Sequence, residues 1–115
     1  MDLKSEITSK IQELQSLEQN LQAFLSQKQN IQVELNETLN ALSELSKADG
    51  EVYKILSGVM IRSSRDSVAK ELEEKRKLLD LRISSIEKQE KIVDDRTKKM
   101  KEEINKLIEK DGEKK

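Results

Sequence analysis

The sequence predicts a mainly α protein: a long antiparallel two-helix coiled coil with a β-hairpin between the helices. Two periodicities support this fold class. Apolar residues recur every seven residues on both sides of the centre, whereas residues 50–65 follow a two-residue rhythm. Composition agrees, because the 115-residue chain is 39% charged and 2% aromatic and contains no proline, which is typical of a coiled coil. Disorder is the competing interpretation of so polar a chain, but a disordered chain needs no regular apolar period.

The first helix is expected over residues 1–48, because apolar residues occupy two heptad rows there. One row contains Leu3, Lys10, Leu17, Phe24, Ile31, Thr38 and Leu45, and the other contains Ile7, Leu14, Leu21, Lys28, Leu35 and Leu42. Only Lys10, Lys28 and Thr38 interrupt these rows. We expect these three residues to set the register or to lie within reach of an acidic group on the partner helix.

A β-hairpin is expected over residues 49–65. Gly50 can end the first helix because glycine accepts the left-handed backbone conformation that follows a helix C-terminus. Val and Ile lie on both sides of Ser57-Gly58, with Tyr53 before it, and Ser57-Gly58 is a suitable two-residue turn. Pairing across this turn predicts the pairs Leu56 with Val59, Ile55 with Met60, Lys54 with Ile61 and Tyr53 with Arg62.

The second helix is expected over residues 66–111, with Ser64 as its N-cap and Asp66 in its first turn. Its heptad rows are Leu72, Leu79, Ile86, Val93, Met100 and Leu107, and Ala69, Arg76, Ile83, Glu90, Thr97 and Ile104. Pairs such as Glu71 with Lys75 and Glu73 with Lys77 are spaced to support this helix. Residues 112–115 are expected to fray, because Gly112 and the terminal charges have nothing to pack against.

The hairpin is the expected site of oligomerisation, within a single domain spanning residues 1–115. A two-stranded hairpin is marginally stable in water and exposes two unpaired edges. Since no other segment offers a strand, hairpins of several subunits are expected to close into an intersubunit β-barrel. The candidate residues are Val52, Tyr53, Ile55, Leu56, Val59, Met60 and Ile61.

Composition excludes several kinds of chemistry. The chain contains no histidine and no cysteine, so it cannot form a Ser-His-Asp triad, a disulfide, or a zinc site with His or Cys ligands. We expect no enzymatic activity, cofactor or metal. The net charge of −1 argues against a nucleic-acid surface, and no apolar run is long enough to span a membrane. The N-terminus lacks the apolar core of a signal peptide, so we expect a soluble, cytoplasmic protein.

Several stretches in and after the hairpin carry a resemblance to a known family. They are residues 52–55 (VYKI), 59–62 (VMIR), 68–75 (VAKELEEK), 79–83 (LDLRI) and 87–90 (EKQE). With these stretches the chain resembles the β-type subunit of prefoldin over about residues 50–95, whereas residues before 50 match in periodicity alone. The chain departs from the family at Ser57-Gly58, where the glycine is expected one position earlier.

This resemblance implies a hetero-oligomer, namely a hexamer of two α-type and four β-type subunits whose hairpins form the barrel. It also implies an ATP-independent chaperone, or holdase, that captures unfolded proteins at the coiled-coil tips. The captured client proteins would then be delivered to a group II chaperonin.

Exposed apolar side chains at the free ends of the helices are the expected client-binding tip, because a holdase needs apolar surface that no partner covers. The candidates are Leu3, Ile7, Ile11, Met100, Ile104, Leu107 and Ile108. Each is equally well explained as an ordinary seam residue. Lysines at 98, 99, 101, 114 and 115 are a second candidate contact, for an acidic chaperonin rim, although charged helix faces usually only keep a coiled coil in solution.

A different class of function remains open. The chain could be a structural coiled-coil tether or adaptor whose hairpin only fixes the oligomer geometry. A chaperone is expected to slow the aggregation of several unrelated unfolded proteins without ATP, whereas a tether is expected to bind one folded partner.

Overall fold

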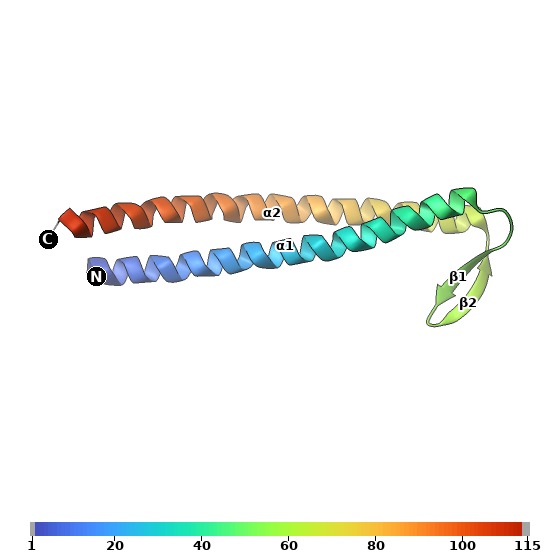
Figure 1. The fold of residues 1–115 in the computed structure, drawn as a ribbon, viewed down its shortest axis with the longest axis horizontal. Coiled ribbons are helices and arrows are strands. Elements are labelled where there is room, and N and C mark those ends of the chain that lie inside the picture. Colours follow the sequence, from blue (N-terminus) through green and yellow to red (C-terminus); the bar gives the residue numbers. More distant parts are fainter. Residues whose placement is uncertain (1, 114–115) are drawn as a thin grey trace. The chain divides into compact units, whose positions relative to one another are not determined.

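The computed structural model describes residues 2–113, and its elements follow in the order helix, strand, strand, helix (Figure 1). Helix α1 spans Leu3–Lys47 and helix α2 spans Arg65–Glu113. Strands β1, Val52–Leu56, and β2, Val59–Ser63, pair antiparallel between the helices. The predicted fold class, two long helices with a hairpin between them, is therefore confirmed.

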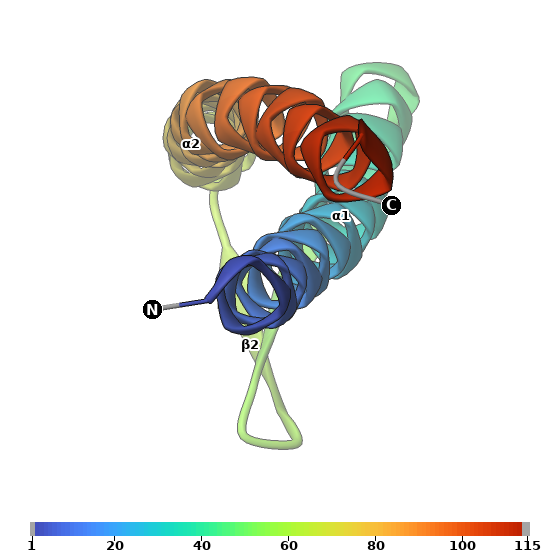
Figure 2. The ribbon, with the colours of Figure 1, turned by 90° about the vertical axis from the view of Figure 1, so that its left-hand side faces the viewer.

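The chain divides into two parts, which we treat separately. The terminal part contains residues 1–27 and 85–115, and the central part contains residues 28–84 with the hairpin. In the terminal part the beginning of α1 and the end of α2 lie side by side in both views (Figures 1 and 2). The Lys10 Nζ to Glu103 Oε2 distance of 3.0 Å shows that the two segments are neighbours, and the ribbon in Figure 1 shows that they run antiparallel.

The predicted heptad rows form the seams of both parts. Every row position in α1 and α2 is buried or half-buried, including the polar ones. Thr38 and Thr97 are buried, and each hydroxyl donates a 2.9 Å hydrogen bond to the carbonyl four residues earlier in its own helix. Lys10 reaches an acidic group of the other helix, as expected, whereas Thr38 satisfies its hydroxyl within α1. A polar side chain can therefore occupy the seam without leaving an unpaired polar group.

The hairpin has the predicted register. Leu56 pairs with Val59, and the pairing continues outward to Val52 and Ser63. The turn residues Ser57 and Gly58 have φ angles of 50° and 79°. Positive φ at both central positions is the requirement of a type I′ turn, which matches the right-handed twist of the strands.

Side-chain caps fix where the helices begin. Ser64 Oγ accepts a 3.1 Å hydrogen bond from the Ser67 amide, so the predicted N-cap of α2 is confirmed. Asp2 Oδ1 accepts a 2.7 Å bond from the Ser5 amide at the start of α1, and this bond lowers the pKa of Asp2. Gly50, with φ of 120°, lies between Lys47 and β1. Residues 112 and 113, the first half of the expected frayed tail, are helical. Residue 1 of the expected first helix and residues 114 and 115 of the expected tail lie outside the described residues.

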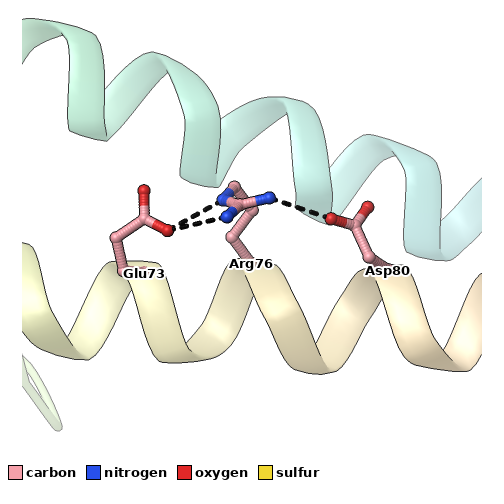
Figure 3. Close-up of polar contacts among 3 residues, drawn as sticks. All are labelled: Glu73, Arg76 and Asp80. Carbon is pink, nitrogen blue, oxygen red and sulfur yellow. Dashed lines mark hydrogen bonds and ion pairs between the residues drawn. The ribbon is translucent and has the colours of Figure 1, made fainter.

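The predicted ion pairs Glu71–Lys75 and Glu73–Lys77 are wrong. Glu71 pairs instead with Lys54 of the hairpin at 2.6 Å, and Lys75 pairs with Glu34 of α1 at 3.2 Å. Glu73 pairs at 2.9 Å with Arg76, and the same guanidinium also reaches Asp80 at 3.1 Å, one turn further on (Figure 3). Both carboxylates raise the pKa of Arg76, and Glu73 has the larger effect. They therefore hold a charged guanidinium at a seam position.

Candidate functional site

The hairpin exposes apolar side chains on both of its faces. On one face, the cross-strand partners Ile55 and Met60 are 69% and 67% exposed. On the other face, Leu56, Val59 and Ile61 are also exposed. All but one of the predicted oligomerisation residues are therefore exposed; the exception is Val52, which is half-buried. Uncovered apolar surface of this kind makes the hairpin a candidate for interaction with another chain.

Polar contacts fix the base of the hairpin. Lys54 forms its ion pair with Glu71 of α2, so the Lys54 face of the hairpin is turned toward this helix. On the opposite face, Glu51 accepts a hydrogen bond from the Tyr53 hydroxyl and pairs with Arg62. The hydrogen bond to Glu51 raises the pKa of the Tyr53 hydroxyl. These contacts orient a segment that has almost no core of its own.

A groove of about 490 Å³ runs along the base of the hairpin. Its apolar lining includes Leu45, Ala48, Val52, Val68 and Leu72. The apolar surface of the hairpin thus continues onto the helix pair that carries it.

The predicted tip residues all lie in the terminal part but differ in exposure. Ile104 is 7% exposed and is a core residue of the seam. Ile11 and Ile108 are 38% and 50% exposed beside the seam. The remaining four are half-buried seam residues: Leu3, Ile7, Met100 and Leu107. Ile11 and Ile108 therefore present the most apolar surface among the predicted tip residues.

One ion pair joins the two helices near this tip. Lys10 donates to Glu103 at 3.0 Å, with 26% and 40% of the two side chains exposed. The hydrogen bond raises the pKa of Lys10 and lowers the pKa of Glu103, and the opposite charges add to both shifts. Each group therefore stabilises the charged form of the other.

Sequence reasoning missed a second groove, of about 690 Å³, further from the termini. Leu21 and Leu25 line it from α1, while Glu87, Asp94 and Lys101 line it from α2. The available signal was Leu25, an apolar residue directly after the seam residue Phe24. A heptad row that is widened by one apolar position predicts an exposed apolar stripe on α1. The wall of the groove that α2 supplies depends on how the two helices pair in detail, which the sequence pattern does not give.

The predicted lysine contact is only partly described. Lys98 pairs with Asp94 at 3.1 Å, and residues 114 and 115 lie outside the described residues. Between residues 2 and 113 no group of three or more His, Cys, Asp or Glu side chains is placed to hold a metal ion. No helix in this same span combines the length and apolar character needed to cross a membrane.

Comparisons with known proteins agree with this arrangement of helices and strands. The family model "Prefoldin subunit" matches residues 8–111, so the similarity includes the N-terminal helix as well as the stretches that carry the sequence resemblance. The prefoldin subunit beta of Archaeoglobus fulgidus is 30% identical over 109 residues, covering 93% of this chain and 94% of the relative. That of Saccharolobus islandicus is 34% identical over 110 residues, covering 94% and 87%.

Solved structures give the same result. The prefoldin beta subunit from Thermococcus strain KS-1 superposes with a TM-score of 0.85 at 30% identity, covering 91% of this chain and 94% of that chain. The beta2 subunit from the same strain, at 19% identity, has a TM-score of 0.68 over 76% of this chain and 95% of its own and shares the fold. The predicted resemblance to β-type subunits is confirmed, and the chain belongs to the prefoldin family of chaperone subunits.

Proposed function

We propose that this chain is a subunit of an ATP-independent holdase, which binds non-native proteins without acting as an enzyme. The observation that carries the proposal is the apolar hairpin, in which Ile55 and Met60 are more than half exposed. A chain of the prefoldin family with so much uncovered surface in a two-stranded segment is suited to assembly with other subunits.

In the proposed assembly, the hairpins of several subunits pair edge to edge and close into a β-barrel. Closure satisfies the unpaired backbone groups at the hairpin edges and buries apolar side chains from at least one face. The partner is an α-type subunit, and the complete particle contains two α-type and four β-type subunits. We place this particle in the cytoplasm.

Capture of the client is assigned to the tip residues of the terminal part, chiefly Ile11 and Ile108. Both are exposed beside a seam that already buries Ile104, so they can bind a client without disrupting the helix pair. Met100 can adapt to clients of different shape, because its unbranched thioether repacks easily. Delivery of the client to a group II chaperonin completes the proposed function, and lysines near residue 100 are the candidate contact with its acidic rim.

Two measurements test the proposal. The solution mass of the chain alone and mixed with a candidate α-type subunit is expected to reveal a mixed hexamer. The mixture is then expected to slow the aggregation of several unrelated unfolded proteins in the absence of ATP. A monomer under all conditions would overturn the assembly, and an oligomer that binds one folded partner and leaves aggregation unchanged would identify a structural tether instead.

A further inference from the structure

Apolar residues widen the seam of the terminal part on one side only. We call the positions directly after the rows of Leu3 and Leu72 the e side, and the positions directly before the other two rows the g side. The e side contains Lys4, Ile11, Glu18, Leu25, Glu87, Asp94, Lys101 and Ile108. The g side contains Glu6, Glu13, Asn20, Gln27, Gln89, Arg96, Glu103 and Lys110. Ile11, Leu25 and Ile108 are all on the e side, and the g side has no apolar residue.

The groove near residue 25 is on the e side. Its lining includes Glu18 and Leu25 of α1 together with Glu87, Asp94 and Lys101 of α2, all of them e positions. Leu21 of the seam also lines it. Leu25 is 40% exposed, so this apolar surface is open to a partner. The groove is separate from Ile11 and Ile108, which are not part of its lining.

Carboxylates outnumber ammonium groups around these leucines. The described lining contains the acidic residues Glu18, Glu87, Glu90 and Asp94 and the basic residues Lys91 and Lys101. Asp94 already pairs with Lys98 at 3.1 Å. Within residues 2–113, by contrast, the side chains of Glu18 and Glu87 take part in no ion pair or hydrogen bond. One of these two carboxylates is supplied by each wall of the groove.

We propose that this groove binds apolar segments of non-native proteins that carry Lys or Arg beside their apolar residues. The apolar residues would cover Leu21 and Leu25, and the cations would reach Glu18 on α1 and Glu87 on α2. The e side nearest the termini differs in charge, because its positions Lys4, Ile11 and Ile108 include no acidic residue, whereas Lys101 belongs to the groove lining. The inference rests on the proposed chaperone function and adds to it a second contact with a charge preference.

The test uses the full-length chain in its assembled form and two labelled synthetic peptides of equal length. Both peptides have the same apolar residues at helical spacing, and their polar positions are all Lys in one and all Glu in the other. Anisotropy titrations are expected to show roughly three- to tenfold tighter binding of the Lys peptide, the effect of two exposed charge pairs. Added salt is expected to reduce this preference by screening.

Matched variants locate the binding. Glu18→Gln with Glu87→Gln is expected to remove most of the preference, whereas Glu13→Gln with Glu102→Gln, which changes the net charge equally away from the groove, is expected to preserve it. Leu25→Ser is expected to weaken the binding of both peptides. The control Ile92→Ser removes a side chain that is also exposed in the terminal part but lies outside the groove, and it is expected to have no effect.

Three outcomes would overturn the inference: no peptide binding, equal affinity for both peptides, or an equal loss in the two double variants. If the assembled wild type still suppresses client aggregation in any of these cases, the proposed chaperone function survives and only the groove assignment fails. If it suppresses no aggregation, the proposed function itself fails.

Discussion

Ser57 adopts a backbone conformation that L-amino acids other than Asn and Asp rarely accept. Its φ of 50° leads directly into Gly58, whose φ is 79°. Asn-Gly is the preferred sequence for such a turn. We therefore predict that Ser57→Asn raises the free energy of unfolding by about 0.5–1 kcal/mol, part of the cost of the left-handed conformation. Urea denaturation of the assembled protein measures this difference.

Gly58→Ala is the control for this turn. An added Cβ would meet no atom within 4 Å, so any loss of stability comes from the positive φ rather than from a clash. We expect a loss of about 1 kcal/mol. A stabilising Gly58→Ala, or a destabilising Ser57→Asn, would show that the turn does not have the assigned conformation in solution.

The Lys10–Glu103 pair predicts a pH dependence at the tip. The raised pKa of Lys10 gives stability that is present below its ordinary value of 10.5 and is lost as the pH rises through the raised value. The lowered pKa of Glu103 gives stability that is present above its ordinary value of 4.5 and is lost as the pH falls through the lowered value. Between these limits we predict that Glu103→Gln lowers the melting temperature by no more than a few degrees, because both side chains are partly exposed.

The measurement is a series of thermal melts of wild type and Glu103→Gln from acidic to alkaline pH. The two proteins are expected to converge in acid, where protonated Glu103 resembles Gln, and again where Lys10 loses its proton. Glu109→Gln, at an exposed position of the same helix, serves as control. A constant difference at every pH would argue against the ion pair as its cause.

At the scale of the helices, burial is confined to the heptad rows. Leu79 is 2% exposed and Leu81, two residues later in α2, is 68% exposed. We predict that Leu79→Ala lowers the free energy of unfolding by about 2–4 kcal/mol, because it leaves a cavity in the seam. Leu81→Ala is expected to change it by less than about 0.5 kcal/mol. Urea denaturation of the two variants tests this contrast, and similar losses would show that α2 packs on a different face.

The same contrast explains how much of the fold the sequence could predict. The heptad period determines which residues of each helix face the seam, and a two-residue turn determines the hairpin register, so both were accessible without coordinates. The ion-pair partners of long polar side chains could not be predicted in this way. Glu71 has suitably spaced Lys75 on its own helix, yet it pairs with Lys54, whose position depends on how the hairpin folds back toward α2.

The e-side groove could not be predicted from the sequence either, for a physical reason. Leu25 marks a wider apolar stripe on α1, but the sequence gives the register between α1 and α2 only approximately. The neighbours Glu87 and Asp94 follow from the register of the predicted antiparallel pair, which brings residues near 25 opposite residues near 90. By contrast, the heptad rows already separate Ile104, a row position, from Ile108, which lies outside both rows, and the structure gives their exposed fractions as 7% and 50%.

At the scale of the whole molecule, we assign different tasks to two apolar surfaces, that of the hairpin and that of the terminal part. The hairpin is assigned to assembly and the terminal part to capture of the client. If this division is correct, the two activities can be removed independently. Assembly should still increase affinity for large clients, because linked binding sites raise the effective concentration of one another.

We predict that Ile55→Asp with Met60→Asp reduces the solution mass to that of a single chain, because two facing carboxylates cannot be buried in a barrel. Leu81→Asp is a matched control, since Leu81 is as exposed as Ile55 but lies outside the hairpin, and it is expected to leave the mass unchanged.

Deletion of residues 1–11 and 100–115 is expected to have the converse effect, with the oligomer retained and suppression of client aggregation lost. Light scattering gives the mass and turbidity gives the suppression; undiminished suppression by the shortened chain would refute the tip assignment, because Ile11 and Ile108 would then be absent from a working chaperone.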